Sequence, residues 1–105
     1  MIRKLFKVAV KSPPAQKQAL VNAYNEQCFW DFNGSTLGNL KDLLRAFKCM
    51  SEVQFSHHVT SEKNDFALWV KHILKDEECA ASLAKATTIK RAVAAVERRL
   101  KDYYL

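Results

Sequence analysis

Hydrophobic residues recur at spacings of three and four along most of the chain, which is the period of an amphipathic α-helix. The pattern is most regular over 36–48, where leucines and a phenylalanine form one side and charged residues the other. The same spacing predicts further helices over residues 13–26, 52–59, 65–75, 77–86 and 88–104. We therefore expect a mainly α fold, a compact bundle of five or six short helices. The core is expected to contain Leu40, Leu44, Phe47, Phe66, Trp69 and Ile73.

Residues that cap helix ends support these boundaries. Ser12, followed by Pro13-Pro14, is typical of an N-cap with proline in the first helical turn. Ser51 and Gln54 match the capping box, in which each side chain bonds to the other residue's backbone N–H. Other N-terminal signals are Asn64 or Asp65, the carboxylates of Asp76-Glu77-Glu78, and Thr87 or Thr88.

Two segments before residue 35 do not follow the helical pattern so simply. Residues 2–11 fit an amphipathic turn, a strand or a basic arm. Residues 28–32 are aromatic and are followed by the turn signal Asn33-Gly34, so they form either one short strand or an extended link. Because a lone strand is unstable, its partner would be residues 4–10 or another chain.

Composition favours one domain over residues 1–105, with 1–11 as a basic arm or strand and 12–105 as a helical core. A chain of 105 residues with 49% hydrophobic content can bury one core but not two. Only two glycines and two prolines are present, too few for the frequent turns of a sandwich or barrel. No apolar run is long enough to span a membrane, and the odd number of widely spaced cysteines leads us to expect a cytoplasmic protein.

Positive charge is concentrated at the two ends of the sequence. Residues 1–25 carry five basic and no acidic side chains, and residues 85–105 carry six basic and two acidic ones. The middle, residues 26–84, has six basic and nine acidic side chains. This distribution is typical of contact with a polyanion, and we predict DNA or RNA as the partner. The predicted contacts are Arg3, Lys4, Lys7, Lys11, Lys90, Arg91, Arg98 and Lys101.

The last predicted helix separates these charges from its apolar residues. At about 100° per residue, Lys90, Arg91, Arg98 and Lys101 fall on one arc, which is either an ordinary solvated face or a binding ridge. A separate apolar arc consists of Ile89, Val93, Val96, Leu100, Tyr103 and Tyr104. An alternative function follows from this arc, a protein–protein adaptor that docks or forms a homodimer through Val93, Val96, Leu100 and the tyrosines. A third alternative is membrane-surface binding through Ile2, Leu5 and Phe6 with the flanking lysines.

No catalytic or cofactor motif is recognisable, so we expect a non-catalytic binding module with no cofactor and no small-molecule substrate. The chain has no phosphate loop, nucleophile elbow or zinc motif. The cysteines Cys28, Cys49 and Cys79 are an odd number at wide spacing, which favours reduced thiols. The histidines His57, His58 and His72 have no metal-ligand spacing either, and we expect no bound metal.

The aromatic cluster offers a second kind of contact. If residues 28–32 are extended, Trp30 points away from Phe29, so that one of the two faces is exposed. Exposed Phe29 or Trp30 could stack on unpaired bases, whereas burial would make both part of the core.

One stretch of the chain resembles a known family. Phe29-Trp30, Asn33-Gly34, the helix from Leu37, the His58-Val59 pair and Asn64-Asp65-Phe66 with Trp69 resemble a family of small prokaryotic domains of unknown function, over about residues 28–84. The resemblance implies no activity. Within it, His58 is either a functional residue or a buried histidine that needs a hydrogen-bond partner, for which a carboxylate or a capped backbone near Asp65 is our candidate.

Overall fold

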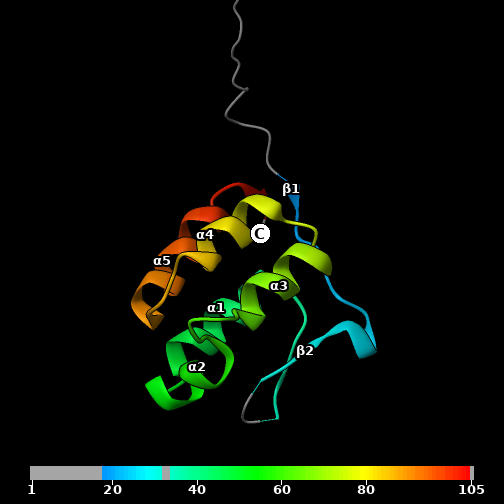
Figure 1. Cartoon of the computed structure of the whole chain (residues 1–105). Helices are drawn as coiled ribbons and strands as arrows, with labels where there is room; N and C mark the ends of the chain where they lie inside the picture. Colours follow the sequence, from blue (N-terminus) through cyan, green and yellow to red (C-terminus); the bar gives the residue numbers. More distant parts are fainter. Residues whose placement is uncertain (1–17, 32–33, 105) are drawn as a thin grey trace, which may run out of the picture.

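The computed structural model describes residues 18–31 and 34–104, and five α-helices make up most of this part of the chain (Figure 1). These are α1 (Leu40–Cys49), α2 (Glu52–His58), α3 (Asp65–His72), α4 (Glu77–Ala84) and α5 (Ile89–Leu100). Helix α3 packs on α4, and α5 packs on both α1 and α4. The mainly α bundle is therefore confirmed. None of the described helices is long and apolar enough to cross a membrane.

In the part of the chain that the structure describes, four strands of two residues each form two small sheets. Strand β2 (Phe29–Trp30) pairs antiparallel with β3 (Thr36–Leu37), so that Trp30 lies opposite Thr36. Strand β1 (Gln18–Ala19) pairs in parallel with β4 (Tyr103–Tyr104). The second sheet brings the first described residues beside the end of α5.

The predicted strand near 28–32 exists, but its predicted partner is wrong. In the described residues its partner is β3, on the far side of the turn that contains Gly34, whereas residues 4–10 lie outside the described residues. Gly34 has a φ of 83°, which glycine adopts without the steric penalty of a side chain. Residues 36–37 therefore belong to a strand, and the helix predicted from residue 36 begins at Leu40 with Asn39 as its N-cap.

The helix predicted over 13–26 is wrong for the part that the structure describes. Strand β1 and a single 3-10 turn, η2 (Asn25–Gln27), occupy this part, while residues 12–17 lie outside the described residues. The backbone N–H of Gln18 donates to the Asp102 carbonyl at 2.8 Å, and that of Ala23 donates to the Gly38 carbonyl at 2.7 Å. These long-range backbone bonds take the place of the local ones that a helix would form here.

The predicted caps of the later helices are confirmed. The Ser51 hydroxyl accepts the Gln54 N–H at 3.2 Å, and the Gln54 side chain accepts the Ser51 N–H at 2.8 Å. Asn64 is the N-cap of α3, and Thr88 is the N-cap of α5. Helix α5 ends at Leu100, earlier than the predicted 104, because Tyr103–Tyr104 pairs with β1.

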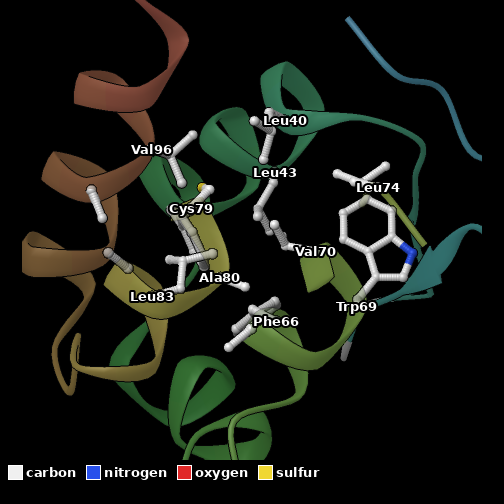
Figure 2. Close-up of a cluster of buried hydrophobic side chains, with 14 of the residues drawn as sticks. Leu40, Leu43, Phe66, Trp69, Val70, Leu74, Cys79, Ala80, Leu83 and Val96 are labelled. Carbon is white, nitrogen blue, oxygen red and sulfur yellow. The ribbon is translucent and has the colours of Figure 1, made fainter. Parts of the chain in front are cut away.

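The core fills the space between α1, α3, α4 and α5 (Figure 2). Of the predicted core residues, Leu40, Phe47, Phe66 and Trp69 are buried, whereas Leu44 and Ile73 are only partly buried at its margin. The indole N–H of Trp69 donates to the Gln27 carbonyl at 2.8 Å. This bond attaches η2 and the strand that follows it to the helical bundle.

Candidate nucleic-acid interface

Helix α5 directs one side into the bundle. Ala92, Ala95, Val96 and Leu100 are buried, and Ile89 and Val93 are partly buried against the same core. Tyr103, just after the helix, is also buried. Of the residues predicted for docking or dimerisation, Val96, Leu100 and Tyr103 are therefore occupied by packing within the chain, and Val93 is partly so. This correction follows from tertiary contacts, because a helix has the same apolar arc whether it faces its own core or a partner.

The opposite side of α5 carries an exposed cluster of positive charge. We call this cluster the basic face, and its members are Lys85, Lys90, Arg91, Arg98 and Lys101. In the described part of the chain, none of the five forms an ion pair with an acidic residue. Four were predicted from the helical arc. The fifth, Lys85, is the C-cap of α4, and only the packing of α4 on α5 brings it here.

Two hollows border the basic face. One lies between α4 and α5, has a volume of about 400 Å³, and is called the α4–α5 trench here. It is lined by Ser82, Lys85, Ala86, Arg91, Ala94, Ala95 and Arg98, with no acidic residue among them. The other hollow is lined by Leu44, Ala94, Glu97, Arg98, Leu100 and Lys101. Its carboxylate, Glu97, pairs with Lys48 at 3.3 Å.

Arg99 belongs to the same helix but has a different environment. Its Nε lies 2.8 Å from Asp76 Oδ2, and its Nη1 lies 3.1 Å from Asp102 and 3.4 Å from Glu78. Only 13% of its side chain is exposed. Arg99 therefore attaches α5 to α4 and is not available to a ligand.

Asp76 is the acceptor at the centre of this buried cluster. Its carboxylate caps α4 by accepting the Cys79 N–H at 3.0 Å, and it also accepts hydrogen bonds from Arg99 and from the Tyr103 hydroxyl. Burial opposes ionisation, but these bonds outweigh it and hold the pKa of the Asp76 carboxyl below its usual value. The cap was visible in the sequence, whereas Arg99 and Tyr103 lie too far along the chain for spacing to connect them to Asp76.

The two aromatic residues predicted for base stacking have different environments. Phe29 is buried, with ring centroids 5.0 Å from Phe66 and 5.7 Å from Trp69, so its predicted stacking on bases is wrong. Trp30 is 63% exposed on the other side of the strand, as the alternation predicted. Figure 1 shows β2 and α5 on opposite sides of the bundle. The hollow beside Trp30 has Glu26 as its one charged lining residue.

His58 is a buried histidine with the predicted partner. Its Nδ1 lies 3.0 Å from Asp65 Oδ2, and its ring packs edge-on against Phe29 and Phe66. Burial by itself would raise the pKa of the Asp65 carboxyl, but its hydrogen bonds with His58 and Lys63 outweigh burial and lower that pKa. Within the described residues His58 Nε2 has no hydrogen-bond partner. The surroundings of this ring are those of a core residue.

The cysteines differ in their surroundings. Cys79 is buried, and burial raises the pKa of its thiol to about 12, so that the reactive thiolate is not formed near neutral pH. Cys28 is half-buried, and Cys49 is exposed. In residues 18–31 and 34–104, no three His, Cys, Asp or Glu side chains lie together in a way that could hold a metal ion.

The N-terminal contacts predicted from sequence, Arg3, Lys4, Lys7 and Lys11, lie outside the described residues, as do Ile2, Leu5 and Phe6. What the structure does describe is the point at which this part of the chain joins the domain. Gln18 pairs with Tyr103, which follows the last residue of the basic face by two positions.

Comparison with known proteins found no matching family model, no similar curated protein and no similar solved structure. The resemblance to a prokaryotic domain family over about residues 28–84 therefore stays a prediction.

Proposed function

We propose that this protein is a cytoplasmic, non-catalytic module that binds nucleic acid through the basic face of α5. One observation carries the proposal: five exposed cations lie together on one side of the domain, without a carboxylate partner in the described chain. Cations in surface ion pairs are partly neutralised, whereas unpaired ones are free to displace counterions from a polyanion. The basic residues of 1–17 would add to this field, because β1 joins the domain next to the end of α5.

The length of α5 is suited to a row of phosphates. Its 12 residues extend over about 18 Å at 1.5 Å per residue. One strand of a duplex has a phosphate about every 3.4 Å along the axis, so a helix of this length can lie beside several of them. Contacts of this kind supply affinity and orientation but do not read bases.

The described side chains support a non-catalytic role. The Cys79 thiol is protonated near neutral pH, and the ring of His58 is buried and bonded to Asp65. A catalytic base or nucleophile must instead reach a substrate within hydrogen-bond distance. Arg99 forms ion pairs with Asp76, Glu78 and Asp102, so its guanidinium group does not face a substrate.

The test is binding of the full chain to labelled duplex and single-stranded DNA and RNA at two salt concentrations. If about four phosphates are neutralised, raising salt from 50 to 200 mM should weaken duplex binding by about 10²-fold. Changing Lys90, Arg91, Arg98 and Lys101 together to Gln should abolish most of the affinity and most of the salt dependence. It should leave the melting temperature nearly unchanged, because the four side chains are exposed.

A matched control removes the same amount of charge elsewhere. Lys41, Lys63, Lys71 and Lys75 are exposed and lie outside α4 and α5, and of these only Lys63 forms an ion pair in the described chain, with Asp65. Changing these four to Gln should weaken binding far less than the change on α5. Equal losses in the two variants, or no binding at low salt, would refute the proposed interface.

A protein–protein adaptor is the second candidate, now through apolar residues outside α5. Large apolar side chains are exposed away from α5: Trp30 at 63%, Val53 at 74% and Leu68 at 52%. Exposed residues of this kind are common at interfaces when they gather in one patch. A solution mass that rises with concentration, and falls on changing Trp30 to Ala, would favour this candidate over nucleic acid.

A further inference from the structure

We infer that the α4–α5 trench holds one phosphodiester strand of a double-stranded nucleic acid, through the guanidinium groups of Arg91 and Arg98 and the ammonium group of Lys85. This inference rests on the proposed function and makes it more specific. It names the part of the basic face that contacts phosphates directly and the class of nucleic acid that is bound.

The trench has cations on both walls and small residues between them. Arg91 and Arg98 lie two turns apart on the same side of α5, about 10 Å along the helix axis. Lys85 comes from the other wall, where it ends α4. Ala86, Ala94 and Ala95 also line the trench, and their short side chains let a sugar–phosphate chain approach the helices closely.

Charge distinguishes this trench from the hollow on the other flank of α5. No acidic residue lines the trench, whereas Glu97 lines the other hollow and forms an ion pair with Lys48. A phosphate in the trench would meet positive side chains and the Ser82 hydroxyl, with no carboxylate to repel it. The field of the basic face therefore favours the trench side.

Two of the three trench cations are arginines, which matters for phosphate recognition. A guanidinium group can donate two parallel hydrogen bonds to one phosphate, whereas a lysine ammonium group acts as a point charge. Lys90 and Lys101, the members of the basic face that do not line the trench, are both lysines. If phosphates bind directly in the trench, the affinity should depend on arginine and not only on positive charge. A diffuse positive field would be the same with lysine.

Among the described side chains of α4 and α5, none is an exposed aromatic that could stack on a base, and this favours a duplex. Proteins that grip single strands combine positive charge with aromatic side chains, each worth about 1–3 kcal/mol per stacked base. The large hydrophobic residues that are exposed in the described chain are Val21, Tyr24, Trp30, Val53 and Leu68. None of them lies on α4 or α5. A duplex offers more charge per unit length than a single strand, so it is the better ligand for this face.

Two matched pairs of substitutions test the trench by fluorescence anisotropy with a labelled DNA duplex and the corresponding single strand. Arg91→Gln with Arg98→Gln removes two trench charges, and Lys90→Gln with Lys101→Gln removes two charges from the same helix outside the trench. Replacing the two arginines should weaken duplex binding at least about tenfold more than replacing the two lysines, a difference of about 1.4 kcal/mol. Arg91→Lys with Arg98→Lys keeps the charge and should still weaken binding several-fold.

The outcomes separate this inference from the proposed function. Equal losses in the two Gln pairs, with affinity kept in the Arg→Lys variant, would overturn the trench but leave binding by a diffuse basic face intact. Tighter binding of the single strand than of the duplex would overturn the choice of ligand. Failure of the wild-type chain to bind any nucleic acid at low salt would overturn both. Thermal melting of each variant, expected to match wild type, confirms that the fold is unchanged.

Discussion

Asp76 joins three parts of the chain, and its replacement by Asn tests how the basic face is held in place. One carboxylate oxygen accepts the Cys79 N–H, and the other accepts hydrogen bonds from Arg99 Nε and the Tyr103 hydroxyl. Asn has nearly the same shape but replaces one oxygen by an amide NH2. In either orientation, that NH2 faces an N–H donor, from Arg99 or from Cys79. Asp76→Asn should therefore weaken the link between α4, α5 and β4.

The expected magnitude follows from burial. The Asp76 side chain is 2% exposed, and removing one partner of a buried ion pair costs about 3–5 kcal/mol. Arg99 keeps Asp102 and Glu78, so we expect the lower end, about 3 kcal/mol. For a domain of this size, that loss lowers the melting temperature by about 12 °C or more. Circular dichroism during heating measures it.

The control is Glu78→Gln, which changes the most exposed partner of the same arginine. The Glu78 side chain is 76% exposed and lies 3.4 Å from Arg99, so its loss should hardly change the melting temperature. If Asp76→Asn melts within about 2 °C of wild type, the carboxylate contributes much less than a buried pair should, and the reasoning is refuted.

Acid should remove the same contribution from the wild-type protein. The folded pKa of Asp76 lies below the unfolded value of 3.8, so the unfolded state binds more protons in acid. The stability from this group is complete well above pH 3.8 and is lost as pH falls through the folded pKa. Denaturant unfolding should show that the free energies of unfolding of wild type and Asp76→Asn become more alike as the pH falls through the folded pKa of Asp76. A difference that stays constant with pH would contradict the assignment.

Two further predictions concern the core and the metal content. Trp69→Ala should destabilise the fold by about 3–5 kcal/mol, because it empties a buried site and also removes the hydrogen bond to Gln27; an unchanged melting curve would contradict that burial. Trp69→Phe should cost less, since it keeps most of the apolar volume. The purified protein should contain no stoichiometric zinc and should keep its melting temperature in a chelator; one equivalent of metal whose removal unfolds the chain would refute this.

The sequence by itself determined the helical elements from residue 40 onward. Regular apolar spacing and polar caps at Ser51, Asn64 and Thr88 are local features, and the bonds they make lie within three or four residues. Such short-range interactions depend on neighbours in the sequence, so their signals can be read from the sequence itself. The five helices and most of their starting residues could therefore be predicted before any tertiary contact was known.

Residues 18–31 and 34–37 were decided by tertiary structure. The sequence predicted a helix up to residue 26 and, over residues 28–32, either a short strand or an extended link. The backbone N–H groups of Gln18 and Ala23 bond to residues far along the chain, and Trp69 anchors Gln27. Pairings over such distances leave no periodic trace in the sequence, so the helix predicted there was wrong.

Part of the candidate site could also be predicted from the sequence, and the rest depended on tertiary packing. A helical projection was enough to place Lys90, Arg91, Arg98 and Lys101 on one side of a helix, since angles within a helix depend only on residue number. Whether the apolar side of that helix meets its own core or a partner, and whether Arg99 is free or buried, depended on which elements pack beside it. The trench exists only because α4 ends with Lys85 next to α5. A groove between two helices is a property of their packing, and neither helix encodes it alone.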